Sequence, residues 1–451
     1  MRQFVWQKYI YGENVSRIKQ PTKMKILIIG SGGREHAITW ALRNKSADRL
    51  QLYCAQGNAG IAHDAQLVHI PAEDHSQLSS FARSEGIDLT FVGPEAPLAA
   101  GLVDAFESAG IPIVGPTAAA ARLEGSKVFA KDFMARHRIP TATYRAADSP
   151  SSALEFLRSG EFGRADEPVV IKADGLAAGK GVVVASNRSE AESAIENLMV
   201  NKVAGSDAAE RIVIEEALSG VEASVLLFSD GRDYVVMPPA RDHKRIGEGD
   251  VGPNTGGMGS ITDGSILDEQ TMQQVISSVI EPTLGGAEQE GFPFRGVLFL
   301  GLMLTSEGPK LLEYNVRFGD PETQAILVRL RTDLLSIFQA IREQRLSDVR
   351  VNWSPGASAC VVAANRGYPG PYEKGAVIQG LDQVSDVQIF HAGTSQSDNG
   401  SFIATGGRVL GITAAADDLK SALARCYAAL DKIHWEGMQF RRDIGRRASA
   451  G

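Results

Sequence analysis

The stretch that follows Met24 constrains the fold of this chain more than any other part of its sequence. The five residues Lys25 to Ile29 are mostly apolar, glycine occupies three of the four positions Gly30 to Gly33, and a helical stretch runs from Arg34 to Asn44. A buried strand, a glycine turn and a helix in this order open a parallel α/β unit. The sequence therefore predicts a parallel sheet at the start of the fold.

Three further stretches repeat this pattern, since each predicted strand is followed by Gly, Pro or Asn and then by a helical stretch. These strands are 50–55, 88–92 and 111–114. The alternation predicts a doubly wound parallel sheet with ligand loops at the carboxyl ends of its strands.

The pattern changes near Gly125. A predicted helix at 127–137 precedes two strands, 169–173 and 181–185, which are joined by a glycine-rich segment. A long helix at 268–291 and four more strands indicate an antiparallel sheet backed by helices, which is an α+β arrangement. The four strands are 211–216, 222–228, 297–305 and 310–315.

A smaller closing domain of α+β type is predicted after Asp333. It contains a helix, strands at 357–364, 387–391 and 408–413, and a final helix at 417–431. A chain of this length exceeds one hydrophobic core, so we predict an α/β and α+β multidomain fold. Its segments are an extension at 1–23, expected to be disordered, an N-terminal α/β domain at 24–125, a lid subdomain at 126–190, a main domain at 191–332 and a C-terminal domain at 333–451.

Composition argues against several classes of function. The net charge of -8 does not suit a general nucleic-acid binder, because phosphate contacts need clustered Lys and Arg. No run approaches the roughly 18 apolar residues of a membrane span, and residues 1–23 lack the apolar core of a signal peptide. Cys54, Cys360 and Cys426 lie far apart, so neither a disulfide framework nor a zinc site is predicted. We expect a cytoplasmic enzyme acting on small molecules, a monomer with a dimer as the alternative.

The turn Gly30 to Gly33 is not a complete dinucleotide-binding fingerprint. Its third glycine would fall at Glu35, and no acidic residue near Cys54 closes the second strand to hold a ribose hydroxyl. The backbone N–H groups can still bind one phosphate monoester, helped by Arg34 or His36. The alternative is a tight turn that only packs a helix on a sheet.

The segment Lys172 to Gly181 carries a more specific signal. It is not a Walker A loop, because the spacing is one residue short and Gly181 stands where Ser or Thr would hold magnesium. Several glycines between two strands form a flap whose N–H groups can cover the β and γ phosphates of a nucleotide, while Lys172 and Lys180 offset their charge. The alternative is a mobile hairpin with incidental lysines.

The stretch Glu313 to Gln324 is the strongest local group of functional residues. Residues two apart on a strand face the same way, so Glu313, Asn315 and Arg317 project together. A carboxylate and an amide oxygen suit Mg²⁺, and a guanidinium can contact a transferring phosphoryl group. A surface strand whose charges pair with one another is the alternative.

Two weaker signals gain value only from their company. The strand end that carries Glu215 and Leu218 could contact adenine, and Glu222 could contact ribose hydroxyls, although an exposed acidic strand end is the commoner explanation. The charges of Asp242 to Arg245 precede a glycine-rich loop at 252–259 and could bind a substrate carboxylate or phosphate. A solvated charged turn fits those four residues equally well.

Taken together, these stretches resemble the ATP-grasp superfamily and, within it, the phosphoribosylamine glycine ligase family of purine synthesis. The resemblance covers the chain from about Met24 to Ala448. The stretches that carry it are 30–36, 57–60, 92–98, 123–127, 174–181, 252–259, 317–324 and 391–393.

The resemblance implies ATP-dependent ligation of glycine to 5-phosphoribosylamine, which yields glycinamide ribonucleotide, ADP and phosphate through glycyl phosphate. It implies Mg²⁺, with Mn²⁺ as a substitute, bound by Glu313 and Asn315, and catalysis by Arg317, Lys172 and Lys180. The implied ATP contacts are Lys127, Lys172, Gly179, Lys180, Gly181, Glu215, Leu218 and Glu222. The implied substrate contacts are Gly32, Gly33, Gly93, Glu95, Asp242, Lys244, Arg317 and Asp320.

Three other functions agree with part of the sequence. Another ATP-grasp ligase, acting on a different acid and amine, would be separated by a panel of substrates. A nicotinamide oxidoreductase is disfavoured by the broken glycine fingerprint. A nucleotide-binding regulatory protein without chemistry is disfavoured by the metal ligands and by Arg317, and it would produce no ADP.

Overall fold

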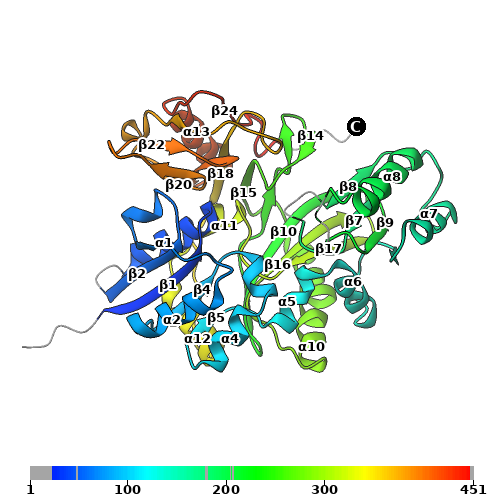
Figure 1. Ribbon diagram of the computed structural model, residues 1–451, viewed down its shortest axis with the longest axis horizontal. Coiled ribbons are helices and arrows are strands. Elements are labelled where there is room, and N and C mark those ends of the chain that lie inside the picture. Colours follow the sequence, from blue (N-terminus) through cyan, green and yellow to red (C-terminus); the bar gives the residue numbers. More distant parts are fainter. Residues whose placement is uncertain (1–22, 47–48, 178–180, 204, 206–207, 447–451) are drawn as a thin grey trace, which may run out of the picture.

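The computed structural model describes residues 23–46, 49–177, 181–203, 205 and 208–446. Apart from Lys23, the extension predicted at 1–23 lies outside the described residues. Figure 1 shows the N-terminal part of the chain on the left, the C-terminal part above it, and a separate group of strands and helices on the right.

The N-terminal part contains a five-stranded sheet in the order β3-β2-β1-β4-β5, and every neighbouring pair is parallel. Its strands are β1 (Met24–Gly30), β2 (Leu50–Gln56), β3 (Gln66–Val68), β4 (Leu89–Val92) and β5 (Ile113–Val114). Alternate side chains of β1 enter two different cores, Leu27 and Ile29 on one face and Ile26 and Ile28 on the other. The sheet is therefore covered on both faces, as the predicted doubly wound fold requires.

Helices on the two faces of this sheet come from distant parts of the chain. The helices in this region are α1 (Gly33–Ser46), η2 (Ile61–His63), α2 (His75–Glu85), α3 (Glu95–Ala99), α4 (Leu102–Ser108), α5 (Ala118–Gly125) and α12 (Leu334–Glu343). Leu78 of α2 and Phe106 of α4 share the core of one face, and Ile38 of α1 shares the other with Phe338 of α12. Thus α12, which follows Asp333, packs on the N-terminal sheet.

A four-stranded antiparallel sheet, the lid sheet, has the order β6-β9-β7-β8. Its strands are β6 (Tyr144–Ala147), β7 (Val169–Ala173), β8 (Val182–Ala185) and β9 (Ile212–Glu216), and the helical segments beside it are α7 (Pro150–Arg158), α8 (Arg188–Ile195) and η3 (Glu196–Val200). The predicted hairpin of β7 and β8 is confirmed, with Lys172 opposite Val182. The sheet also contains β9, which lies beyond the division that we predicted at residue 190, because β9 pairs between β6 and β7.

The largest sheet has ten strands along the order β17-β16-β10-β12-β15-β18-β23-β20, with β11 beside β10 and β24 beside β18. Its strands are β10 (Val221–Asp230), β11 (Tyr234–Val236), β12 (Ala240–Asp242), β15 (Gly259–Thr262), β16 (Arg295–Thr305), β17 (Gly308–Asn315), β18 (Ala357–Asn365), β20 (Gln388–His391), β23 (Arg408–Ala416) and β24 (Met438–Gln439). The antiparallel pair of β15 and β18 joins the central strands to the C-terminal ones. The sequence did not predict this continuity.

The remaining elements surround this sheet. The predicted helix at 268–291 is a continuous helical run of α9 (Glu269–Val275), the π-helical segment η4 (Ile276–Ile280) and α10 (Glu281–Gln289). The others are α6 (Lys127–Arg136), β13 (Arg245–Gly247), β14 (Val251–Asn254), α11 (Glu322–Leu327), η5 (Leu346–Asp348), β19 (Ala376–Val377), η6 (Leu381–Gln383), β21 (Thr394–Gln396), β22 (Phe402–Ala404) and α13 (Leu419–Leu430). The mixture of a parallel sheet with antiparallel sheets confirms the predicted α/β and α+β class.

In the described part of the chain, no helix has the length and apolar character needed to cross a bilayer. The three cysteines are buried free thiols.

Candidate active site

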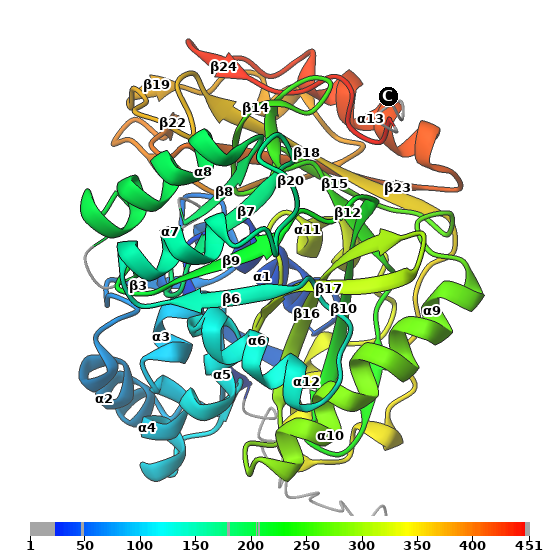
Figure 2. The same cartoon turned by 90° about the vertical axis from the view of Figure 1, so that its right-hand side faces the viewer.

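A cleft of about 480 Å³ lies where the lid sheet, the strand β17, the N-terminal domain and the C-terminal strands meet. In Figure 2 the strands of the lid sheet cross in front of β16 and β17, and residues of both sheets line this cleft. The predicted site residues that line it are Glu95, Lys127, Lys172, Gly181, Glu215, Asp242, Lys244, Glu313, Asn315, Arg317 and Asp320. Residues spread over more than 220 positions of sequence thus converge on one cavity.

Other predicted residues stand apart from the cleft wall as the described residues form it. They are Gly32, Gly33, Gly93, Leu218 and Glu222. Glu222 still reaches the site indirectly, because its carboxylate lies 3.1 Å from the ammonium of Lys244. Gly179 and Lys180 fall outside the described residues.

The lid hairpin is tied to the start of α6 by one carboxylate. Asp174 Oδ1 accepts hydrogen bonds from Ser126 Oγ and Val128 N, both at 2.8 Å, and its Oδ2 pairs with Arg211 at 2.6 Å. A carboxylate is favourable here because the helix N-terminus presents unpaired N–H groups and a positive dipole end. The contact holds Lys127, the first residue of α6, at the base of the lid.

Two buried lysines form ion pairs with one carboxylate on the cleft wall. Glu215 Oε2 lies 3.0 Å from Nζ of both Lys131 and Lys172, and Lys131 Nζ also donates to Thr141 Oγ1 at 2.7 Å. Burial lowers the pKa of Lys131 to about 8, although the neighbouring Glu215 opposes this shift. Burial also lowers the pKa of Lys127. The arrangement concentrates positive charge at the end of the cleft below the lid.

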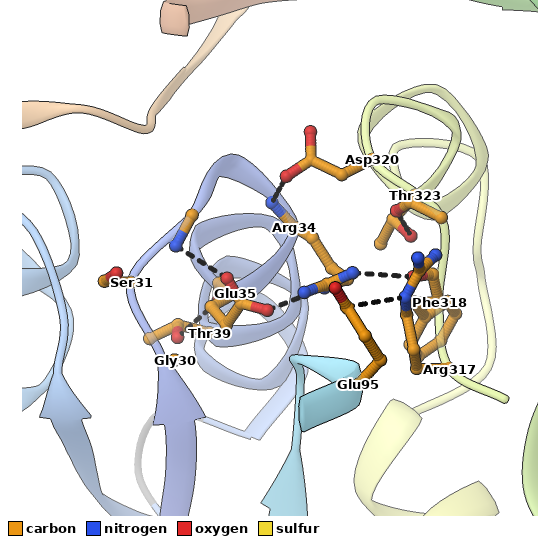
Figure 3. A network of polar contacts seen from close by, with 12 residues as sticks. Gly30, Ser31, Arg34, Glu35, Thr39, Glu95, Arg317, Phe318, Asp320 and Thr323 are labelled. Carbon is orange, nitrogen blue, oxygen red and sulfur yellow. Dashed lines mark hydrogen bonds and ion pairs between the residues drawn. The ribbon is translucent and has the colours of Figure 1, made fainter. Parts of the chain in front are cut away.

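Arg317 is held by two carboxylates, of which Figure 3 shows Glu95. Its Nη2 donates to Glu124 Oε1 at 2.8 Å and to Asn315 Oδ1 at 3.1 Å, and its Nε lies 3.2 Å from Glu95 Oε2. Burial alone would lower its pKa, but Glu124 and Glu95 raise it, so the guanidinium is always charged. By contrast, burial raises the pKa of Glu124 despite that guanidinium. The carboxylates fix the guanidinium at the edge of the cleft.

Glu313 is the carboxylate at the centre of the site. Burial would raise its pKa, but Lys244, Lys172 and Lys127 together lower it, which keeps the group ionised. Its Oε1 lies 3.9 Å from Lys244 Nζ. A carboxylate and the amide oxygen of Asn315 are hard oxygen donors, and Mg²⁺ typically takes few ligands from protein and the rest from phosphate and water. The donor set therefore fits such an ion, although the described residues contain no group of three His, Cys, Asp or Glu side chains that could hold a metal without a substrate.

A carboxylate fills the glycine turn at the start of α1. Glu35 Oε2 accepts a hydrogen bond from Gly32 N at 2.6 Å, and a Cβ at Gly30 or Gly93 would collide with the Glu35 side chain. The glycines thus leave space for the Glu35 side chain. This agrees with the alternative interpretation of this turn as one that only packs a helix on a sheet. Arg34, which pairs with Glu35 at 2.6 Å and donates to Phe318 O at 3.0 Å, lines the cleft.

A second carboxylate lies on the same helix end. Arg34 N donates to Asp320 Oδ2 at 3.1 Å, and Arg408 lies 3.4 Å from Asp320 Oδ1. Burial would raise the pKa of Asp320, but Arg408 and Arg34 lower it. Burial and the neighbouring Glu322 raise the pKa of Asp242, which also lines the cleft. Asp242 is thus not part of a solvated charged turn.

Family models match almost the whole described chain. The N domain of phosphoribosylglycinamide synthetase matches residues 24–124, its ATP-grasp (A) domain residues 125–323 and its C domain residues 358–447. The chain belongs to the phosphoribosylglycinamide synthetase family. The resemblance inferred from the sequence is confirmed.

Curated members of the phosphoribosylglycinamide synthetase family agree along their full length. A phosphoribosylamine–glycine ligase of Vibrio cholerae is 48% identical over 433 residues, which is 95% of this chain and 99% of that protein. One from Caldanaerobacter subterraneus is 46% identical over 422 residues, with 93% and 99% covered. A crystal structure of the Thermotoga maritima ligase matches with a TM-score of 0.80 and 35% identity, over 93% of this chain and 100% of that one.

A more distant likeness concerns the fold alone. The biotin carboxylase domain of a Hydrogenobacter thermophilus 2-oxoglutarate carboxylase, solved with MgADP, matches with a TM-score of 0.71 at 16% identity, over 93% of this chain and 92% of that one. The two chains therefore share their overall fold.

Several cleft residues of this family member were missed by sequence reasoning. They are Glu124, Lys131, Glu322, Tyr368 and Arg408. Lys131 had one usable signal, since it lies one helical turn after Lys127 and shares its helix face. Glu124 and Glu322 lie inside the stretches 123–127 and 317–324 that carry the resemblance, but no role was assigned to them. Tyr368 and Arg408 come from C-terminal segments that only the fold brings to the cleft.

Proposed function

We propose that the cleft joins glycine to 5-phosphoribosylamine through a glycyl phosphate intermediate, with Mg²⁺ held by Glu313 and Asn315. The broader activity follows from family membership: the chain is an ATP-dependent carbon–nitrogen ligase of purine biosynthesis that ligates glycine to phosphoribosylamine and forms ADP. The observation that carries the finer proposal is that the Lys127, Lys172, Glu313 and Arg317 side chains line a single cavity.

The nucleotide would bind under the lid. Lys127 and Lys172 would neutralise its phosphates, and the β9 end, with Glu215, Leu218 and Glu222, would hold adenine and ribose. Gly179, Lys180 and Gly181 would close over the β and γ phosphates, which excludes water from an acyl phosphate. In support, the base of this flap is fixed to α6 through Asp174.

The phosphoryl transfer needs no nucleophilic side chain. A glycine carboxylate oxygen would attack the γ phosphorus and ADP would leave; the neutral amine of phosphoribosylamine would then attack the acyl carbon, lose a proton and release phosphate. Arg317 would stabilise the charge that develops on the transferring group, and Glu124 and Glu95 keep its guanidinium in place. When bound, the divalent ion supplies further charge neutralisation.

The second substrate would lie toward the N-terminal domain. Gly32, Gly33, Gly93 and Glu95 would contact phosphoribosylamine, and Asp242, Lys244, Arg317 and Asp320 would hold glycine and the reacting groups. In this structure the Gly32 N–H already donates a hydrogen bond to the Glu35 carboxylate. Binding of a phosphate at this turn would therefore require the Glu35 carboxylate to move aside.

A panel of substrates tests the choice of acid and amine. Purified protein with ATP, Mg²⁺ and freshly prepared phosphoribosylamine should release ADP with glycine and much less with alanine or aspartate. ADP release that is equal with all three acids, or that does not depend on the amine, would contradict the proposal.

Oxygen isotope transfer tests the intermediate. If glycine labelled with ¹⁸O in its carboxylate is used, one labelled oxygen should appear in the released phosphate, because the acyl phosphate passes that oxygen to phosphorus. Unlabelled phosphate after complete turnover would exclude glycyl phosphate. Replacing Mg²⁺ by Mn²⁺ in the same assay decides which ion supports the faster reaction.

We further propose that the protein acts in the cytoplasm as a monomer. Light scattering at assay concentrations tests the oligomeric state, and a dimer is the alternative.

A further inference from the structure

His243 lies between two residues of the cleft and points the other way. Asp242 and Lys244 line the cleft, while His243 is only 5% exposed and meets the C-terminal part of the chain. Its Nε2 accepts a hydrogen bond from Gly445 N at 3.0 Å, and its Nδ1 lies 3.1 Å from Gly259 O. Since a backbone N–H only donates, Nε2 carries no proton, and the neutral ring has its proton on Nδ1. Both ring nitrogens are therefore used.

The segment Arg441–Gly445, which we call the strap, also holds the hairpin that follows His243. The Arg441 side chain, 2% exposed, donates from Nη1 to Asp250 Oδ1 at 2.7 Å and to Arg245 O at 2.9 Å. In the other direction, Gly249 N donates to Asp443 Oδ2 at 2.7 Å. The strap thus binds both the first strand of the β13–β14 hairpin and its turn.

The strap is itself anchored to the C-terminal core. Ile444 is 1% exposed and belongs to the main hydrophobic cluster. The Tyr427 hydroxyl on α13 donates to Arg441 O at 3.1 Å and accepts from Ile444 N at 3.2 Å. A Cβ at Gly259 would lie 2.9 Å from Ile444 Cδ1, so the strap packs directly on β15. It links α13 firmly to the wall of the cleft.

We propose that the strap positions the substrate end of the cleft, with His243 as the positioning residue through which it acts. The stretch that carries Asp242 and Lys244 follows the three-residue strand β12, and its backbone bonds to Met258, Gly259 and Thr255. The His243 ring adds a side-chain contact from this stretch to the strap. A fixed His243 directs its two neighbours toward the cleft because alternate side chains of an extended chain point to opposite sides. This inference rests on the proposed assignment of Asp242 and Lys244 to the substrates.

Two substitutions of His243 separate its two hydrogen bonds. In His243→Gln, the longer amide can present its oxygen to Gly445 N, whereas in His243→Asn the shorter amide can donate to Gly259 O but does not reach the strap. We expect His243→Asn to lower kcat about tenfold, the effect of one lost buried hydrogen bond, and to raise KM for glycine. KM for ATP should rise less than KM for glycine, because Lys127 and Lys172 keep their own contacts to Gly175 O and Glu215. His243→Gln should retain most of the activity.

Two further variants make the test decisive. Arg442→Ala is the matched control, since its exposed side chain lies in the strap but contacts Asp431 and the Phe440 ring and not the hairpin, and it should behave as the unmodified protein. Asp242→Asn is the reference for the substrate end and should be strongly impaired.

Each outcome bears on the inference. If Asp242→Asn has normal kinetics, the assignment of the substrate end falls and the inference with it. Suppose instead that Asp242→Asn is impaired. If His243→Asn then has normal turnover, or if His243→Asn raises KM for ATP as much as KM for glycine, the strap has no positioning role and only this inference is overturned. Loss of activity in His243→Asn together with near-normal activity in His243→Gln supports the inference.

Discussion

Removal of the Arg317 guanidinium separates its proposed catalytic role from its structural one. In Arg317→Ala, the buried carboxylate of Glu124 and the half-buried one of Glu95 lose their common partner; their side chains are 8% and 31% exposed. Breaking such a pair by removing one partner costs about 3–5 kcal/mol of stability. Loss of a group that stabilises charge in the transition state lowers kcat by about 100- to 1,000-fold. Both effects are expected in this variant.

A double variant distinguishes the two effects. Glu124→Gln keeps an oxygen that can accept from Val316 N, the second partner of this carboxylate at 2.7 Å, but removes the buried charge. Arg317→Ala combined with Glu124→Gln should therefore recover most of the lost stability in urea unfolding while kcat stays as low as in the single variant.

Steady-state ADP release and direct ATP binding complete the experiment. The dissociation constant for ATP should change little in either variant, because Lys127 and Lys172 are intact. If the double variant regains turnover together with stability, Arg317 is only a structural residue, and a single variant with turnover within a few-fold of the unmodified protein would refute the reasoning outright.

Three other predictions follow from the site and its surroundings. Gly93→Ala should lower the free energy of unfolding by about 1–3 kcal/mol, since the added methyl group overlaps the carboxylate in the neighbouring turn; Gly264→Ala, which meets open space, should leave the urea midpoint unchanged. Burial lowers the pKa of His36 to about 3 and that of His391 to about 4, whereas both have a pKa near 6.5 in the unfolded chain. Below pH 6.5 the unfolded chain therefore binds more protons than the folded one. The urea midpoint should fall as the pH drops from 6.5 toward 4 and should level off above 6.5. Chelation of divalent ions should abolish ADP release, and Glu313→Gln should raise the Mg²⁺ concentration that gives half-maximal activity.

The elements that sequence reasoning predicted are those with local signals. The strand β1, its glycine turn and α1 follow from apolar runs and turn residues, and the hairpin of β7 and β8 follows from two β-branched runs around glycines. The position of β9 inside the lid sheet could not be predicted, because its partners β6 and β7 are chosen by contacts across tens of residues. For the same reason, the pairing of β15 with β18 was missed.

The candidate site divides along the same line. Glu313, Asn315 and Arg317 are neighbours in sequence, and strand alternation predicted that they would share a cavity. All three line it, although β17 ends at Asn315 and Arg317 lies in the loop that follows. The pairing of Glu124 with Arg317 and that of Arg408 with Asp320 were not predicted. These partners lie 193 and 88 positions apart in the sequence, and only the fold brings them together. The residue types indicated the chemistry of the site, but only the fold shows which side chains pair with one another.

The glycine turn at α1 shows why a motif does not define a ligand by itself. Its amides and helix dipole attract a negative group, but that group need not come from a substrate. In this chain Glu35 and Asp320 supply carboxylates to the Gly32 and Arg34 amides, while Arg34 balances Glu35. A substrate phosphate would thus compete with carboxylates of the protein itself, Glu35 at the Gly32 amide and Asp320 at the Arg34 amide. Because Arg317 belongs to the same loop as Asp320, occupation of the helix end and placement of the guanidinium proposed to be catalytic are physically linked.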